Sequence, residues 1–134
     1  MLKEKLHKNP ALNIFDMEYA SPDMRLVIKL RNLVEKHYAD NKTRAFYCNV
    51  LGVSLAKIND LTKEYFDRTL FQLIQDRLLA EAKKLLRETD LSVKEVCFKL
   101  GFVDQAYFGR VIKKGTGYTP MELREEAMTA VVNL

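Results

Sequence analysis

The chain contains one short sequence pattern twice, and this internal repeat constrains its fold more than any other feature. Residues 48–52 (CNVLG) align with residues 97–101 (CFKLG) at an offset of 49. After the glycine the offset becomes 50, so that Ile58 falls on Phe108 and Lys63 on Lys113. The second copy therefore has one extra residue in its turn. Two short helices joined by a glycine-containing turn are typical of a helix-turn-helix, so the repeat predicts two such units.

Helix signals cover most of the chain after residue 21. Apolar residues recur every three or four positions, and Ser92 with Glu95 and Thr119 with Glu122 have the spacing of capping boxes. Pro120 also suits the first position of a helix. The signals predict helices over about 22–38, 43–51, 54–66, 69–88, 92–101, 104–114 and 119–130. No segment alternates apolar and polar residues convincingly, so we expect an all-α fold.

The same spacing predicts which side chains form the core. In the first helix the inward stripe is Val27, Leu30, Val34 and Tyr38. The helix over 54–66 is expected to bury Ile58, Leu61 and Tyr65, and the helix over 104–114 is expected to bury Phe108, Val111 and Ile112. The long helix keeps the period at Leu70, Leu73, Ile74, Leu78, Ala82, Leu85 and Leu86. Cys48 and Cys97 occupy equivalent positions, where a small side chain allows close helix packing, so we expect both to be inert core residues.

Composition narrows the functional classes. The 134 residues fit one domain or two very small ones, and a net charge of +4 with a pI near 9.0 is compatible with a polyanionic partner. Two cysteines cannot complete a structural zinc site alone, and we expect no metal, no cofactor and a reducing, cytoplasmic setting. Neither a signal peptide nor a membrane-spanning stretch is expected.

Residues 81–124 (EAKKLLRETDLSVKEVCFKLGFVDQAYFGRVIKKGTGYTPMELR) resemble the signature of the AraC/XylS family of bacterial transcription regulators. Residues 45–74 resemble that family's first helix-turn-helix, and the resemblance covers roughly residues 22–126. The positions at family spacing are Ala82, Leu85, Leu86, Gly101, Phe102, Tyr107, Phe108, Lys113, Gly117, Pro120 and Arg124.

This resemblance implies a seven-helix, double helix-turn-helix domain of homeodomain-like units joined by a long linker helix. It also implies sequence-specific binding of double-stranded DNA to regulate transcription, with the two recognition helices in adjacent major grooves. RNA polymerase is then an expected partner, and the family's usual sensory domain is absent from these residues. A free-standing short activator is the alternative to the C-terminal part of a longer effector-responsive protein.

The expected organisation has a leader or linker stub over residues 1–20, the DNA-binding domain over 21–130 and a tail over 131–134. Within the domain, the first helix-turn-helix covers about 43–66, the linker helix 69–88 and the second helix-turn-helix 92–115. Asp67 stands where the family often has glycine, and it tolerates a left-handed backbone better than most residues. Ile112 stands where phenylalanine is common.

The outward faces of the two recognition helices carry the expected base-reading residues. Arg110 is the best candidate, because a guanidinium can bond to O6 and N7 of guanine together. Gln105 or Asn59 can read adenine, and Ala106 can contact a thymine methyl group. Asp60 would accept from a cytosine amine or pair with a nearby lysine such as Lys57 or Lys63. The full set is Ala56, Asn59, Asp60, Gln105, Ala106, Gly109 and Arg110, of which Gly109 permits only close approach.

Phosphate contacts are expected from lysines and from helix starts. Amide groups at the start of a helix lack an internal acceptor and lie at the positive end of its dipole. The expected phosphate-contacting residues are Thr43, Ser54, Lys57, Lys63, Ser92, Lys113, Lys114 and Thr119.

Two other functional classes stay open from the sequence. A helical adaptor could contact RNA polymerase or another regulator without reading DNA, and it would be indifferent to Arg110. An enzyme would need a nucleophile or an acid–base pair in a cleft. For Cys48 or Cys97 to serve as that nucleophile, the thiol would have to be exposed and its pKa lowered.

Overall fold

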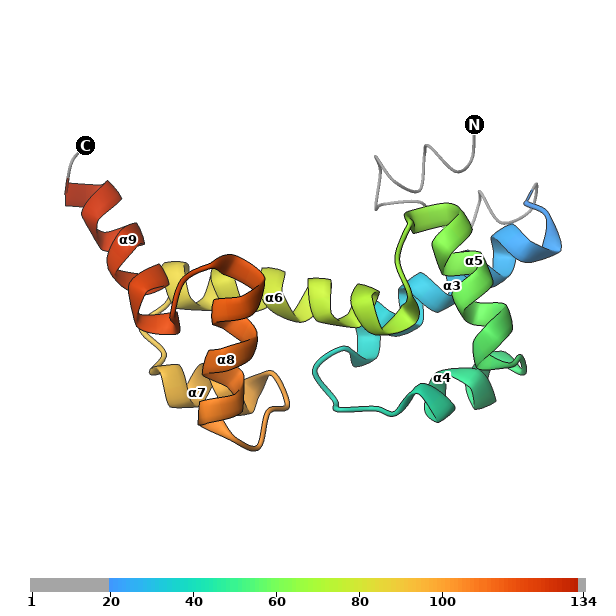
Figure 1. Cartoon of the computed structure of the whole chain (residues 1–134), viewed down its shortest axis with the longest axis horizontal. Coiled ribbons are helices and arrows are strands. Elements are labelled where there is room, and N and C mark those ends of the chain that lie inside the picture. The colour runs from blue at the N-terminus through green and yellow to red at the C-terminus, as the bar shows by residue number, and fades with distance from the viewer. Residues whose placement is uncertain (1–19, 133–134) are drawn as a thin grey trace. The chain divides into compact units, whose positions relative to one another are not determined.

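The computed structural model describes residues 20–132, and in this range it contains seven α-helices and no β-strand (Figure 1). The helices are α3 (Pro22–His37), α4 (Arg44–Leu51), α5 (Leu55–Phe66), α6 (Leu70–Glu88), α7 (Val93–Lys99), α8 (Gln105–Thr116) and α9 (Pro120–Val132). This confirms the all-α, double helix-turn-helix prediction. The expected leader, apart from Ala20, and the last two residues of the expected tail lie outside the described residues.

The chain divides into two units. Unit 1 holds α3, α4, α5 and α6 as far as Ile74, and unit 2 holds the short segment 38–41 together with the chain from Gln75 onward. Each unit thus contains one helix-turn-helix, formed by α4 and α5 in unit 1 and by α7 and α8 in unit 2.

Unit 1 is built where α3 packs against α4 and α5. Its buried cluster consists of Ala20, Met24, Val27, Ile28, Leu61 and Tyr65. Ser21 begins α3 as predicted, because its Oγ accepts a hydrogen bond from the amide of Met24 at 3.2 Å. The predicted inward positions Leu30 and Val34 are also buried.

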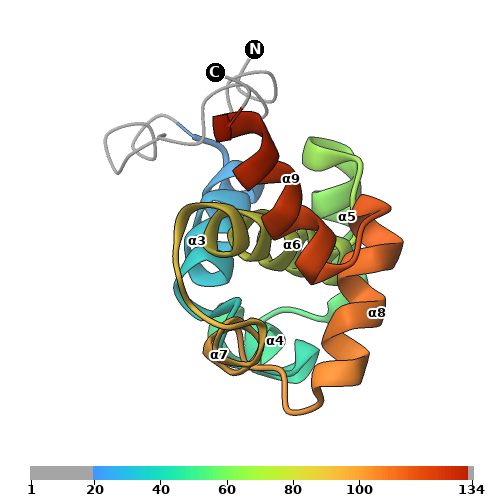
Figure 2. The same ribbon diagram turned by 90° about the vertical axis from the view of Figure 1, so that its left-hand side faces the viewer.

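Unit 2 is built around the second half of α6, against which α7, α8 and α9 gather (Figures 1 and 2). Its buried cluster consists of Ala82, Leu85, Leu86, Val96, Cys97, Leu100, Phe108, Ile112 and Leu123. Arg124 holds the end of α6, since its guanidinium donates to the carbonyl oxygens of Leu86 at 3.0 Å and Thr89 at 3.4 Å. These bonds satisfy carbonyl groups that the end of a helix leaves without partners.

Tyr38 does not extend the inward stripe of α3, so that prediction was wrong. The helix ends at His37, and Tyr38 instead packs beside the core of unit 2. There the guanidinium of Arg77 lies 4.3 Å from the centre of its ring. The segment 38–41 no longer follows the helical path of α3, so the helical period does not apply to Tyr38.

The two cysteines differ in burial. Cys97 is buried, as predicted, and its thiol lies 3.9 Å from the carbonyl oxygen of Phe102. Cys48 is only partly buried, which corrects the prediction that it belongs to the core. In α4 the fully buried position is taken by the neighbouring Tyr47, whose relative exposure is 1%.

Local signals place most helix ends correctly. Thr43 and Ser54 are the caps that precede α4 and α5, and α4 ends at Gly52 in the left-handed conformation. Asp67 ends α5 with φ 59°, the conformation expected where the family often has glycine. One predicted core residue of α8, Val111, is only partly buried, so the prediction that it belongs to the core is corrected.

The end of α8 was predicted too early. The helix continues through Gly115 to Thr116 and ends at Gly117, whose φ is 84°. Inside the helix Gly115 lies beside Leu79, whose side chain would have to shift if residue 115 had a Cβ atom, because that atom would lie 2.5 Å from Cδ1 of Leu79. The glycine that stops the helix is therefore the second of the two.

The internal repeat extends beyond the recognition helices. At the start of α6, Thr69 and Gln72 bond reciprocally between backbone and side chain. Thr119 and Glu122 form the same arrangement at the start of α9, at an offset of 50. The repeating unit thus includes the beginning of the helix that follows each helix-turn-helix.

Candidate nucleic-acid interface

Helix α8 presents one open face on which four of the predicted base-reading residues lie together. Gln105, Ala106 and Arg110 are exposed, whereas Phe108 and Ile112, on the other side of the helix, are buried. A Cβ atom added at Gly109 would meet nothing within 4 Å. The helix is oriented by its start, where Asp104 accepts from the amides of Ala106 and Tyr107. This face can approach a flat surface or a groove without rearrangement.

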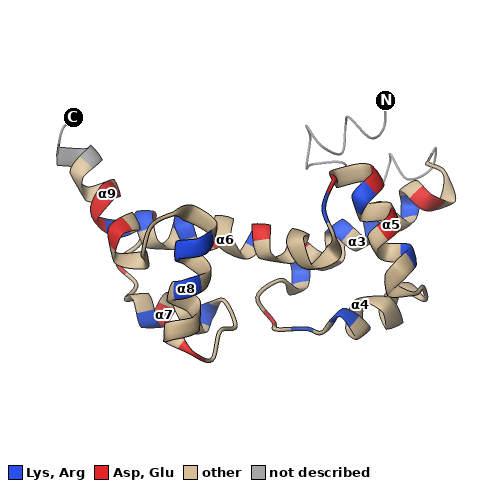
Figure 3. Ribbon diagram, viewed as in Figure 1, with Lys and Arg blue, Asp and Glu red and all other residues tan. Residues whose placement is uncertain are grey.

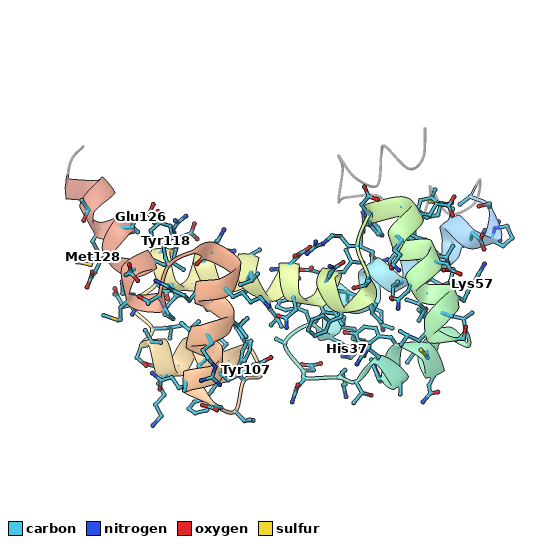
Figure 4. All side chains as sticks on the ribbon, in the orientation of Figure 1. His37, Lys57, Tyr107, Tyr118, Glu126 and Met128 are labelled. Carbon is cyan, nitrogen blue, oxygen red and sulfur yellow. The ribbon has the colours of Figure 1, made fainter. Side chains whose placement is uncertain are left out.

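Tyr107 supports Arg110, a role that the sequence analysis did not assign to it. The guanidinium carbon of Arg110 lies 5.8 Å from the centre of the Tyr107 ring, and this ring lies 6.0 Å from that of Phe102 (Figure 4). An exposed cation–π contact contributes about 0.5–1 kcal/mol. The contact restricts the arginine while leaving its hydrogen-bond donors accessible. The sequence signal for this contact was the spacing of three residues between an aromatic residue and an arginine on one helix, which places the two side chains next to each other.

Helix α5 presents a different set. Ala56, Asp60 and Lys63 are exposed, as predicted for an outward face. Asn59 is only partly buried, but its Oδ1 accepts from the amide of Leu70 at 3.0 Å. Paired reading of adenine needs both the oxygen and the nitrogen of the carboxamide. Asn59 thus holds the start of α6 through Oδ1, so paired reading of adenine by this residue would have to share or release that hydrogen bond.

Unit 2 has no counterpart of the hydrogen bond between Asn59 and Leu70, because both residues are replaced at the equivalent positions. Gly109 occupies the position of Asn59 and has no side chain that could accept a hydrogen bond, and Pro120 occupies the position of Leu70. Proline has no amide hydrogen to donate. The replacement leaves no unsatisfied amide, and it keeps the face of α8 open at Gly109.

Two of the predicted phosphate-contacting lysines form ion pairs. Nζ of Lys57 lies 3.1 Å from a carboxylate oxygen of Asp23, with both side chains about half exposed (Figure 4). Nζ of Lys113 lies 3.7 Å from Oε1 of Glu122. Exposed pairs of this kind contribute little free energy, so a phosphate can compete for either lysine. Lys57 thus pairs with Asp23, not with Asp60 as considered from the sequence.

The four predicted helix starts differ in charge. Glu95 and Glu122 complete capping boxes with Ser92 and Thr119, and the hydrogen bonds from these partners lower the pKa of both glutamates. Both carboxylates are therefore ionised near neutral pH and repel a phosphate. The first turns of α4 and α5 carry no acidic residue.

Of these helix starts, the one at Thr43 suits a phosphate best. Lys42 and Arg44 flank Thr43 and are exposed. The aromatic ring of Phe46 fixes this end of α4, because it packs edge-on against His37 at 4.9 Å between ring centres (Figure 4). Thr43 itself accepts from the amide of Phe46 at 3.2 Å, which leaves the first two amides of the helix for a ligand.

The thiol of Cys97 does not meet the requirement for a nucleophile. Burial raises its pKa, and the carboxylate of Asp104 raises it further. A raised pKa keeps the thiol protonated at neutral pH. Among the described helices, none is both long and apolar enough to cross a membrane.

The sequence of the chain is similar to those of known transcription regulators. The family described as a helix-turn-helix domain matches residues 47–126. The uncharacterized HTH-type transcriptional regulator YijO of Escherichia coli (strain K12) is 30% identical over 110 residues, which are 82% of this chain and 39% of that protein. The arabinose operon regulatory protein of the same organism is 32% identical over 92 residues, which are 68% of this chain and 32% of that protein.

A solved structure is similar over most of the chain. The C-terminal domain of AraT, a response regulator from Geobacillus stearothermophilus, gives a TM-score of 0.73 at 25% identity. The alignment covers 81% of this chain and 88% of that domain. The present chain thus matches most of that C-terminal domain, whereas it spans well under half of the length of the two relatives named above.

Proposed function

The chain belongs to the AraC/XylS family of DNA-binding transcription regulators, and we propose that it reads duplex DNA with the exposed faces of α5 and α8. Sequence-specific DNA binding for the regulation of transcription is the function of the family domain. One observation supports assigning this function to particular residues of the chain. A single face of α8 presents Gln105, Ala106, Gly109 and Arg110, with no acidic residue in the helix.

Arg110 is the principal base-reading residue of the proposal. Its guanidinium offers paired donors that match O6 and N7 of guanine, and Tyr107 restricts its motion. Gln105 is placed to read adenine, and Ala106 can contact a thymine methyl group. Gly109 lets the backbone of α8 come close to the groove. In α5 the proposed base contacts are Ala56 and Asp60.

Phosphate contacts fix the position of these helices on the duplex. We assign them to the start of α4 at Thr43, to the start of α5 at Ser54, and to Lys63 and Lys114, which are exposed. Lys57 and Lys113 also contact phosphate in this proposal, each exchanging its surface carboxylate partner for a phosphate group. Ser92 and Thr119 are weaker candidates because a glutamate shares each of these helix starts.

The internal repeat supports docking of the two recognition helices in adjacent major grooves, in half-sites about one helical turn, or 10–10.5 base pairs, apart. The proposal includes RNA polymerase as the partner through which bound protein regulates transcription, and a cytoplasmic location where it meets the chromosome. It also includes a sensory domain outside this chain, since the curated relatives are longer.

The test is selection of bound sites from a random pool of duplex DNA at about 50 and 200 mM salt. The wild-type chain should select two half-sites about one turn apart. Arg110→Ala should lose base preference at one position, at a cost of about 1–3 kcal/mol for the cognate guanine. Lys114→Ala is the matched control, because it removes one positive charge from the same face of α8.

The control separates base reading from attraction to phosphate. Lys114→Ala should weaken binding to all sequences equally and reduce the slope of log K against log salt by about 0.9. If Arg110→Ala behaves in the same uniform way, Arg110 contacts phosphate and the proposed base-reading role is wrong. If the wild-type chain selects no motif, the whole assignment of α5 and α8 fails.

A further inference from the structure

We propose that the two units divide the work of recognition: α8 reads guanine through Arg110 and attracts phosphate more strongly than α5, while α5 uses Asp60 to require cytosine at the equivalent position of its half-site. This inference rests on the proposed function and adds to it the base that unit 1 selects. It predicts an asymmetric operator although the two modules share one architecture.

Asp60 and Arg110 occupy the same position on two equivalent helices. Both α5 and α8 have 12 residues, and each is capped one residue before its start, by Ser54 and Asp104. The core residues Ile58 and Phe108 lie at the same offset of 50 and have relative exposures of 1% and 0%. The register therefore places residues 60 and 110 at corresponding points of the two recognition faces.

The charges on the two helices are unequal. Helix α8 carries Arg110, Lys113 and Lys114 and no acidic residue, whereas α5 carries two lysines, one aspartate and one glutamate (Figure 3). The charge is thus +3 on α8 and zero on α5. One lysine of each helix has a carboxylate partner, Lys57 with Asp23 and Lys113 with Glu122, so these ion pairs do not remove the difference. Because attraction to phosphate supplies most non-specific affinity, α8 contributes more of it than α5.

The carboxylate of Asp60 faces solvent without an ion-pair partner in the part of the chain that the structure describes. Asp60 is exposed, and among the described residues none forms an ion pair with it. When a duplex approaches α5, this charge loses water and meets either a donor or an acceptor on a base edge. An unmatched carboxylate is costly to bury, so the DNA sequence decides whether unit 1 docks favourably.

Cytosine fits this carboxylate best. A carboxylate only accepts hydrogen bonds, and in the major groove cytosine offers the N4 amine as a donor. Guanine and thymine present acceptor oxygens, and adenine presents its N7 acceptor beside its amine. Asp60 therefore selects cytosine chiefly by rejecting the other bases. Asn59, the neighbouring polar residue, is held by the amide of Leu70 and does not compete for the same base.

The test uses the same site selection on the complete chain, followed by measurement of Kd on the selected sites and on single-base variants. The wild type should prefer cytosine at one unit 1 position by roughly 5- to 100-fold. Asp60→Asn should bind most sequences more tightly than the wild type and lose much of that preference. Asp60→Arg should change the preferred base at this position from cytosine to guanine, as in unit 2.

Glu125→Gln is the matched control, since it removes one exposed negative charge from α9 instead of from a recognition helix. It should leave the base preference at every position unchanged. Unchanged helical circular dichroism of each variant shows that folding is retained, which is expected because Asp60 is exposed.

The outcomes separate this inference from the proposed function. If Asp60→Asn and Asp60→Arg leave the selected motif unchanged while Arg110→Ala still erases one position, the division of work is wrong and the reading by α8 stands. If Glu125→Gln raises affinity as much as Asp60→Asn and neither alters the motif, Asp60 acts only through net charge, and the inference is overturned. A wild-type chain without a motif would overturn both.

Discussion

Gly101 is the position at which a single methyl group should damage unit 2 most. Its φ is 85°, in the left-handed region, and it ends α7 against the segment 38–41. A Cβ atom placed there would clash with the carbonyl oxygen of Ala39 and lie 3.2 Å from its carbonyl carbon. These atoms belong to the backbone, so no side-chain rotation relieves the contact.

The expected cost of Gly101→Ala has two parts. The left-handed conformation costs a residue with a Cβ atom roughly 1–2 kcal/mol. Overpacking against a backbone that must move adds about 1–3 kcal/mol. The sum, about 2–5 kcal/mol, is a large fraction of the stability of a small domain. For a unit of this size it corresponds to a fall in Tm of roughly 8 °C or more.

Two glycines of the same chain provide matched controls. Gly52 and Gly117 have φ of 69° and 84°, but a Cβ atom at either would meet nothing within 4 Å. Gly52→Ala and Gly117→Ala should therefore show only the conformational cost of roughly 1–2 kcal/mol.

The assay is urea unfolding followed by circular dichroism, with selection of bound DNA sites as a second measurement. Gly101→Ala should unfold at clearly lower urea than either control, and at 37 °C it should lose preference in the half-site of unit 2 before that of unit 1. Equal unfolding midpoints for the three variants would refute the reasoning, because the close approach to Ala39 would then carry no energy.

Three further predictions concern the helix ends. Asn59→Ala should lower the free energy of unfolding by about 1 kcal/mol, because it leaves the amide of Leu70 without its acceptor. In a double-mutant cycle this loss should shrink when residue 70 is proline, which has no amide hydrogen. An undiminished loss would show that Asn59 does not stabilise the protein through this hydrogen bond. Arg124→Ala should cost about 1.5–3 kcal/mol in urea unfolding by releasing the end of α6, and no loss of stability would contradict that capping role. Hydrogen bonds in the capping boxes lower the pKa of Glu95 and Glu122, so their contribution to stability is present above the ordinary glutamate pKa, about 4.3, and is lost as the pH falls through the lowered values. Between about pH 6 and pH 3, Tm should therefore fall less for the double variant Glu95→Gln, Glu122→Gln than for the wild type. An equal fall in Tm would show that the capping boxes are not the cause.

Much of the fold followed from signals between residues close in sequence. The caps at Thr43, Ser54, Ser92 and Thr119 were predictable because each cap bonds to an amide three residues ahead. The left-handed end at Asp67 was expected from the family resemblance, and the offset of 49 followed by 50 was visible directly in the repeated sequence. Such interactions depend on a few consecutive residues, so the amino-acid order already contains them.

The candidate site was predictable in part. Helical periodicity placed Gln105, Ala106 and Arg110 on the exposed face of α8 and Asp60 on that of α5. It could not show that Asn59 is held by the amide of Leu70, eleven residues later in the chain. Nor could it show that Lys57 pairs with Asp23 of another helix, since both contacts require α5 to be packed in place.

The sequence by itself determined that the chain is helical, that it holds two related helix-turn-helix units, and which helix faces point outward. Only the tertiary structure decided that Tyr38 packs with unit 2, that Gly115 lies inside α8 beside Leu79, and that Gly101 meets the backbone at Ala39. The physical reason is the separation along the chain over which each interaction acts. Capping and periodicity act over three or four residues, whereas these contacts join segments more than thirty residues apart, and their partners are defined only once the core has formed.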